Sequence, residues 1–197
     1  SYGIEALAGV ILEFDTNTEK TEQYILKFID ECNCPLIAVN LLFALPKTPL
    51  WDRLTMEKRL LPDEEAYHTN IRFKMPKEIV LAMWRNCTRA AYEPGAVYRR
   101  YQHNMETTYR ARLQLRTGRF GRGPNQLPKL GYILTKILWT IGLRSSYRKE
   151  FWQQIKRTLC EGDLEHAIKI SVMGHHFIEY GKECENTSVR ASYYTKA

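Results

Sequence analysis

The stretch NLLFALPKTPLWDRL, residues 40–54, takes the chain from an apolar run into a charged segment within a few positions. Pro46 and Pro49 fix φ and withhold two amide donors, so neither a strand nor a helix can continue through this point. The segment that begins at Thr48 is charged and suits a short helix. The stretch therefore predicts the end of a buried strand, a sharp turn and an exit helix.

Two apolar runs and the segment between them predict a βαβ unit. Residues 4–14, IEALAGVILEF, and residues 35–45, PLIAVNLLFAL, are continuous apolar runs of the kind found in buried strands. Between them, residues 18–32 place apolar side chains at helical spacing, and a proline follows. A strand, a helix and a strand in this order imply two parallel strands joined by a right-handed crossover.

Alternation along the first run divides its side chains between two faces. One face is apolar and is formed by Ile4, Ala6, Ala8, Val10 and Leu12. The other face is more polar and is formed by Glu5, Leu7, Gly9, Ile11 and Glu13. A single βαβ unit leaves one sheet face and both sheet edges open to water. The missing strands must come from another part of the protein or from a second copy, so we expect the chain to self-associate when expressed alone.

The rest of the chain predicts a mostly α-helical domain. Residues 61–76 have the composition of a loop, and about five later segments, between residues 76 and 187, carry apolar or aromatic residues at i, i+3, i+4 spacing. The cluster TGRFGRGPNQLP interrupts them. The fold class is thus an α/β portion followed by a helical domain. We place the βαβ portion at residues 1–56, a linker at 57–76 and the helical domain at 77–197.

Composition excludes several classes of protein. The 197 residues are 44% hydrophobic and 26% charged, and no apolar run is long enough to span a bilayer. No secretory signal precedes the first strand, and the chain begins like a cut made inside a larger protein. Five cysteines at irregular spacing favour a reducing cytoplasm, and the CNC pair supplies too few ligands for a metal. We expect a cytoplasmic location.

The net charge of +7 comes mainly from the second half of the chain, above all from residues 99–122. Arginine-rich segments bind nucleic acid, anionic lipid or acidic proteins, and they also occur as solvated helix faces. A non-catalytic basic binding module is therefore one hypothesis for the function. Its binding to nucleic acid would fall steeply with salt.

Several segments together resemble a known family. GVILEFDTNTE resembles the penultimate strand and turn of the radical S-adenosylmethionine barrel, and LLFALPKTPLWDRL resembles its last strand with the LPGTPL continuation. The segments TNIRFKMP, YEPGAVYRRY and GHHFIEY are similar to the helical C-terminal domain of cobalamin-binding radical enzymes, the group that contains the hopanoid C-2 methylases. The resemblance implies the last βαβ unit of a barrel followed by that helical domain.

The resemblance also implies an activity for a longer parent protein. Such a parent would use a [4Fe–4S] cluster, S-adenosylmethionine and cobalamin to methylate an unactivated carbon of a hydrophobic, hopanoid-like substrate. An oxidative cyclase or another iron–sulfur oxidoreductase of the tetrapyrrole type is the alternative within the same family. The family's CxxxCxxC motif and its Rossmann-like cobalamin domain do not occur in this sequence. We therefore expect the chain alone to be inert, with no catalytic residue, metal or cofactor of its own.

The resemblance assigns cofactor-binding positions to the two strands. In the family the first strand of the pair passes the adenine of S-adenosylmethionine, which would place Ile11 against the nucleotide and give Gly9 the role of allowing close approach. Packing within the barrel is the alternative role for both residues. Glu13 stands where the family usually has Gly, and its carboxylate would meet a cation or narrow the site. Asn40, a polar residue within an apolar strand, is a candidate for nucleotide or substrate binding or for a structural hydrogen bond. Lys47 also replaces a usual Gly, so a left-handed turn there would be strained.

Glu5, a polar residue of the first run, is like Asn40 a candidate for substrate contact or for a structural hydrogen bond. Tyr67 and His68 are expected near substrate, because loops at the rim of a barrel carry binding groups. The adjacent His175 and His176 point about 100° apart on a helix and cannot chelate one metal together. The expected partners are the rest of the barrel, the cobalamin domain and a hydrophobic small molecule.

A last feature is the apolar stripe of residues 132–141, which is flanked by Lys129, Lys136 and Arg144. We expect it to form helical core. The alternatives are a groove for a greasy substrate and a peripheral contact with the inner membrane, in which the three cations would face phosphates.

Overall fold

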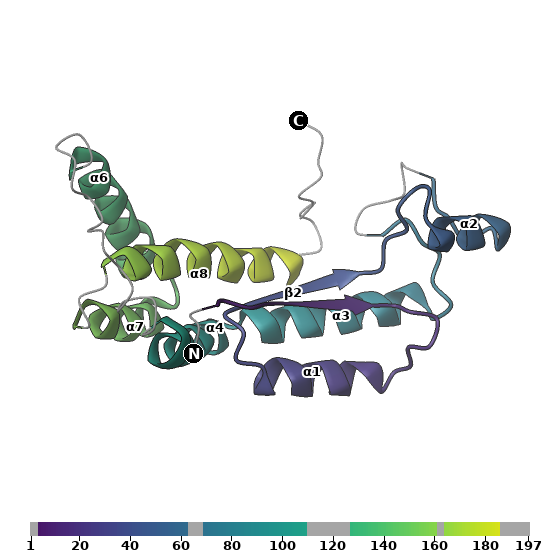
Figure 1. Ribbon diagram of the computed structural model, residues 1–197, viewed down its shortest axis with the longest axis horizontal. Helices are drawn as coiled ribbons and strands as arrows, with labels where there is room; N and C mark the ends of the chain where they lie inside the picture. The colour runs from purple at the N-terminus through teal and green to yellow at the C-terminus, as the bar shows by residue number, and fades with distance from the viewer. Residues whose placement is uncertain (1–3, 63–68, 110–126, 161–163, 186–197) are drawn as a thin grey trace. The chain divides into compact units, whose positions relative to one another are not determined.

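The computed structural model describes residues 4–62, 69–109, 127–160 and 164–185 (Figure 1). Contacts divide the chain into two compact units. The first, here called the sheet unit, contains residues 8–32, 37–91 and the chain from 180 onward. The second, the helical unit, contains the chain up to residue 7 together with 33–36 and 92–179. Each unit is described by itself.

The sheet unit has the predicted order of strand, helix and strand. Its elements are the strands β1 (Leu7–Leu12) and β2 (Leu36–Leu41) and the helices α1 (Thr21–Glu31), α2 (Pro49–Met56) and α3 (Lys77–Tyr92). The two strands are neighbours in a two-stranded sheet and run parallel (Figure 1). The Leu42 amide donates to the Leu12 carbonyl oxygen at 2.9 Å. In a parallel pair this bond sets Leu41 beside Leu12 and, one step back, Asn40 beside Ile11.

One face of the sheet is covered by α1 and α3, which lie on the same side of the strands (Figure 1). Alternate strand residues, among them Leu12, Ile37 and Val39, are buried on this side. The Trp84 indole on α3 donates to the Val39 carbonyl at 3.1 Å. In a parallel pair, alternate residues direct their N–H and C=O groups away from the partner strand, and Val39 is one of these residues on β2. The bond from Trp84 therefore satisfies a backbone acceptor on the outer edge of β2. The helices therefore protect one face and part of one edge.

The other face of the sheet is open in the described part of the chain. Leu7 is 65% exposed and Ile11 is 45% exposed, and Gly9 and Asn40 are also exposed. Burial alternates as predicted from Leu7 to Leu12, but Ile4, which was assigned to the apolar face, is 76% exposed and lies before the strand. If these strands belonged to a larger sheet, other residues would have to cover this open face.

The turn after β2 is held by a loop from far along the chain. The Asn70 side chain accepts from the Ala44 amide and donates to the Ala44 carbonyl, both at 2.8 Å. The Thr69 hydroxyl donates to the Leu42 carbonyl at 2.6 Å. A small core of Ala44, Leu54 and Ile71 forms beneath these bonds. The TNIR segment thus acts as a clamp on the exit from the strand.

The start of α2 follows from its sequence. Thr48 is the N-cap residue and accepts a hydrogen bond from the Trp51 amide at 3.3 Å, and Pro49 occupies the first helical position, where no amide donor is needed. Lys47, just before the cap, has φ 65°. The turn is therefore the left-handed type that the sequence identified as strained for a side chain.

The helical unit contains the remaining described helices. They are α4 (Pro94–Asn104) with the π-helical continuation η1 (Met105–Tyr109), α6 (Leu127–Ile137) with the π-helical continuation η2 (Leu138–Leu143), α7 (Arg148–Cys160) and α8 (Leu164–Glu185), the last of which leaves the unit after residue 179. Together with α3 these match the five predicted helical segments within the described residues. The core gathers aromatic and aliphatic side chains, including Tyr101, Tyr109, Phe151 and Ile170.

Candidate functional site

The candidate site lies at the carboxyl ends of β1 and β2. Ligands of open parallel sheets bind outside this end of the strands. Here the end of β1 leads into Glu13 and Asp15, and the end of β2 leads into the turn clamped by Asn70. The candidate site consists of these turns and the adjoining open face of the sheet.

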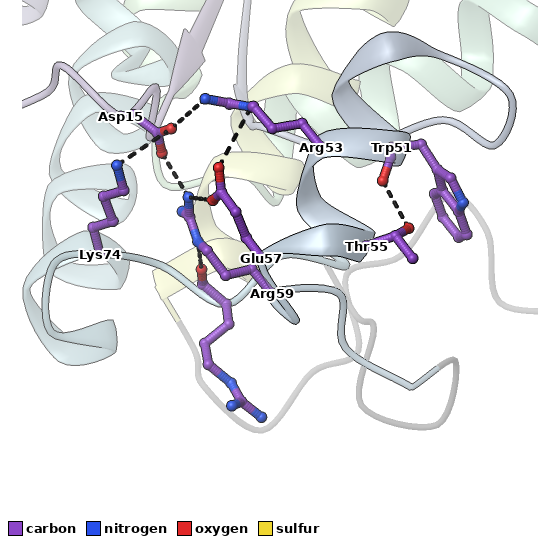
Figure 2. Close-up of polar contacts among 8 residues, drawn as sticks. Asp15, Trp51, Arg53, Thr55, Glu57, Arg59 and Lys74 are labelled. Carbon is purple, nitrogen blue, oxygen red and sulfur yellow. Dashed lines mark hydrogen bonds and ion pairs between the residues drawn. The ribbon is translucent and has the colours of Figure 1, made fainter.

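Asp15 is the centre of an ionic cluster (Figure 2). One carboxylate oxygen lies 2.8 Å from Arg53 Nη1 and 3.5 Å from Lys74 Nζ, and the other lies 2.9 Å from Arg59 Nη1. Glu57 adds a second carboxylate, 2.9 Å from the same Arg59 nitrogen. The cluster ties the turn after β1 to α2, to the segment that follows α2 and to the segment that precedes α3.

The pKa of Asp15 shows what this carboxylate can do. Partial burial would raise the pKa, but the hydrogen bond and charge of Arg59, together with the charges of Lys74 and Arg53, outweigh burial and leave the pKa below its ordinary value. Asp15 is therefore ionised at neutral pH and its oxygens are engaged by cations. It fixes the turn and is unsuited to act as a general base.

Glu13 lies in a different environment two residues earlier. Its backbone has φ 78° and its side chain is 5% exposed. Burial raises the pKa of the Glu13 carboxyl, while a backbone hydrogen bond from Met75 and the charge of Arg59 oppose the rise. The left-handed backbone ends the alternation of β1 at Leu12, so Glu13 does not join Ile11 on the open face. Burial outweighs the charge of Arg59 in its effect on this pKa.

The structure brings Gly9, Ile11 and Asn40 together on the open face. Ile11 and Asn40 are neighbours across the two strands by register, and Gly9 is one alternation step from Ile11 on β1. A Cβ added at Gly9 would meet nothing within 4 Å. The three residues form an exposed, mostly apolar surface with one amide group, which offers an aromatic heterocycle apolar contact and one hydrogen-bonding side chain.

Glu5 belongs to the helical unit and is engaged there. Its carboxylate accepts from the Tyr109 hydroxyl at 2.7 Å and lies 2.5 Å from Lys169 Nζ. These contacts attach the chain before β1 to η1 and α8. Tyr67 and His68, the other two residues expected near substrate, lie outside the described residues.

The histidines considered at the sequence level have aromatic neighbours. His175 Nδ1 is hydrogen-bonded to the Tyr147 hydroxyl, His166 lies over Tyr109 with ring centroids 4.5 Å apart, and His176 packs edge-on against Phe177. Among residues 4–62, 69–109, 127–160 and 164–185, no group of three histidine, cysteine or acidic side chains is placed to hold a metal ion.

Sequence reasoning missed the residues that hold the site in shape. Asp15 was treated as part of a turn, and Asn70 as part of a loop. The only signal for Asp15 was its place directly after a strand, since its cationic partners lie at least 38 residues away along the chain. Asn70 carried no local signal, because its partner Ala44 is 26 residues away.

Comparison with known proteins places these features in a family. The sequence model of a family described as a domain of unknown function, DUF4070, matches residues 48–189. This match begins at the N-cap of α2 and continues through α8. The structure presents a βαβ unit with an attached helical part. The chain belongs to the DUF4070 family.

Two curated proteins are similar over most of the chain. The hopanoid C-2 methylase of Rhodopseudomonas palustris (strain TIE-1) is 40% identical over 196 residues, which cover 99% of this chain and 37% of that protein. An uncharacterized methyltransferase of Synechocystis sp. is 26% identical over 192 residues, which cover 90% of this chain and 33% of that protein. The chain thus spans about a third of the length of both relatives. No solved structure matches it.

Proposed function

We propose that this chain is part of a radical S-adenosylmethionine methylase that acts on a hydrophobic, hopanoid-like substrate. The observation that carries the proposal is the similarity over 99% of the chain to a protein named hopanoid C-2 methylase, together with the methyltransferase name of the second relative. The parallel βαβ unit with one open face supports it, because such a unit suits one section of a barrel.

In this proposal the open face of the sheet is turned toward the barrel interior, and the remaining strands are supplied by chain beyond these residues. Gly9 and Ile11 would lie along the nucleotide, and Asn40 would bond its edge. The exposure of these three residues and the open space above Gly9 support this role in nucleotide binding. Glu13 and Asp15 support this surface indirectly, because they fix the turn that follows β1.

The cofactors of the proposed parent divide into two groups. We assign Gly9, Ile11 and Asn40 to S-adenosylmethionine, because their exposed apolar surface and single amide suit an adenine ring. Nothing in the described residues fits an iron–sulfur cluster, and no residue here is assigned to cobalamin. When bound in the parent, these groups would supply hydrogen abstraction from an unactivated carbon and transfer of a methyl group.

The proposal is tested in the full-length protein that contains this chain. Anaerobically reconstituted protein is incubated with a hopanoid and S-adenosylmethionine, and the product is analysed by mass spectrometry. We expect the mass to rise by one CH2 unit, because a methyl group replaces a hydrogen. Loss of hydrogen without a gain of carbon would indicate the oxidative cyclase chemistry instead and would contradict the methylase proposal.

Two variants test the role of the open face. Gly9→Val places a branched side chain into space that is empty here and on a strand that accepts it, so the sheet should fold normally. We expect its affinity for S-adenosylmethionine, measured by equilibrium dialysis, to fall about tenfold, which is roughly 1.4 kcal/mol. Asn40→Leu should weaken binding in the same direction. Lys27→Ala, at an exposed position of α1, is the matched control, and unchanged affinity in both test variants would overturn the assignment.

A further inference from the structure

The helix α6 and its continuation η2 expose large apolar side chains. Tyr132 is 67% exposed, Trp139 is 58% exposed and Leu143 is 60% exposed. The sequence predicted that the stripe of residues 132–141 would be helical core, and for Tyr132 and Trp139 that prediction is wrong. Tyr132, Lys136, Trp139 and Leu143 follow each other at steps of four, three and four residues, which places them along one side of a helix.

The opposite side of the segment is anchored. Ile137 and Ile141 are buried in the helical unit, and the Trp152 indole of α7 donates to the Gly142 carbonyl at 2.9 Å. A Cβ at Gly142 would lie 3.1 Å from the Trp152 ring, so glycine lets the two segments approach closely. The anchoring accounts for the buried side chains and leaves the apolar side in contact with solvent.

Basic side chains accompany the exposed aromatics. Lys136 Nζ lies 5.9 Å from the centre of the Tyr132 ring, and the Arg144 guanidinium lies 5.9 Å from that of Trp139. Lys129 lies one turn before Tyr132. The sequence from residue 127 to residue 149 contains no aspartate or glutamate. We call the surface formed by Lys129, Tyr132, Lys136, Trp139, Leu143 and Arg144 the α6–η2 face.

We propose that the α6–η2 face is a docking surface for an anionic lipid bilayer. A helix that lies in the bilayer interface combines tryptophan, tyrosine and leucine with lysine and arginine, whose alkyl stems cover apolar surface while their charges reach phosphates. Anionic headgroups complement a surface with three cations and no acid. Within the described residues no helix is long and apolar enough to cross a membrane, so the contact is peripheral.

Charge complementarity is what selects the lipid surface over other occupants. A second copy of this chain would bring the same uncompensated cations against the face and would repel it. A hydrophobic protein partner would leave three cations without counter-charges. A bilayer that contains phosphatidylglycerol satisfies both the apolar and the basic side chains at once.

Flotation of the whole chain with lipid vesicles tests this proposal. We expect binding to vesicles made of equal parts phosphatidylcholine and phosphatidylglycerol and little binding to phosphatidylcholine alone. Replacement of Lys129, Lys136 and Arg144 by glutamine should lower the affinity about fivefold for each cation removed. Trp139→Ala should lower it about tenfold, because the indole would no longer enter the interface. Each variant is checked for native helix content by circular dichroism.

The matched control is Leu159→Ala, which removes a 47% exposed apolar side chain from α7 in the same unit and should leave binding unchanged. Absence of flotation, equal binding to the two kinds of vesicle, or equal loss in Leu159→Ala and Trp139→Ala would overturn the proposal. Dissociation of a dimer by Trp139→Ala, seen by light scattering without flotation, would show a second copy as the occupant. Flotation measures binding and not methylation, so this result is independent of the proposed activity.

Discussion

The chain leaves its two strands through turns that are held in different ways. After β1, the turn is fixed by charge, since Asp15 contacts Arg53, Arg59 and Lys74. After β2, the turn is fixed by an uncharged side chain, since Asn70 bonds both polar groups of Ala44. An ionic clamp depends on pH and salt, and an amide clamp does not. Two exits from one sheet should therefore respond differently to the same conditions.

The largest effect is expected from the amide clamp. Asn70→Ala removes two hydrogen bonds and leaves a buried N–H and a buried C=O of Ala44 without their partner. We expect a loss of about 3 kcal/mol in the free energy of unfolding, measured by urea denaturation. The loss should be the same in low and high salt, because no charge is involved.

Asn70→Asp is the informative companion. It keeps the shape and the acceptor but cannot donate to the Ala44 carbonyl when ionised. Its stability should therefore recover as the pH is lowered and the new carboxyl becomes protonated. A cost below about 0.5 kcal/mol for Asn70→Ala would show that the turn does not depend on this clamp.

The ionic clamp should give a smaller effect that depends on pH. Asp15→Asn removes charge-assisted hydrogen bonds and should cost about 2 kcal/mol at neutral pH. The pKa of Asp15 is lowered from 3.8 in the folded protein, so its stabilisation is complete above that value and is lost as the pH falls toward the folded pKa. The difference between the two proteins should thus shrink in acid, and it should also shrink in high salt.

Asp52→Asn is the matched control for this prediction, because Asp52 is exposed on α2 and is not one of the carboxylates in the ion pairs that define the cluster. It should change stability by less than about 0.5 kcal/mol at any of these conditions. Equal effects of Asp15→Asn and Asp52→Asn would mean that the cluster contributes nothing specific.

The two turns also show how far the sequence could predict the structure. The order of strand, helix, strand and exit helix followed from apolar runs and from Pro46 and Pro49, because these signals act locally. The clamps did not follow, because Asp15 meets Arg53 across 38 residues and Asn70 meets Ala44 across 26. Spacing along a chain carries no information about such partners.

Periodicity has a similar limit in the helices. The pattern predicted α3 and α6 equally well, yet Trp84 on α3 is 4% exposed and Trp139 in η2 is 58% exposed. A period of 3.6 residues shows that a helix has an apolar side but does not show what covers it.

The candidate site was predicted only in part, because alternation along a strand does not show where the backbone leaves the strand. Alternation placed Gly9 and Ile11 on one face, whereas the left-handed backbone removed Glu13 from it.

Backbone strain is the property that the two turns share, and it predicts a smaller effect of opposite sign. Lys47 has φ 65°, a region that costs a side chain about 1 kcal/mol and costs glycine almost nothing. Lys47→Gly should therefore stabilise the protein by up to about 1 kcal/mol in urea denaturation. Lys27→Gly, within the exposed part of α1, should instead destabilise by about 1 kcal/mol. Destabilisation by both would contradict the inferred strain.

The smallest effect is expected at Glu13, where charge and strain can be separated. Burial raises the pKa of this carboxyl from 4.5, so the folded state favours the protonated form. Stability is then lost as the pH rises from 4.5 through the folded pKa, which is opposite in sign to the dependence for Asp15. Glu13→Gln keeps the side-chain shape and the left-handed backbone but removes the titration. The variant should gain stability relative to the parent as the pH rises over this range and should match it in acid. If the difference in stability between Glu13→Gln and the parent did not change with pH, the inference that the pKa of Glu13 is raised would be wrong. The attraction of Arg59 would then balance the cost of burying the carboxylate.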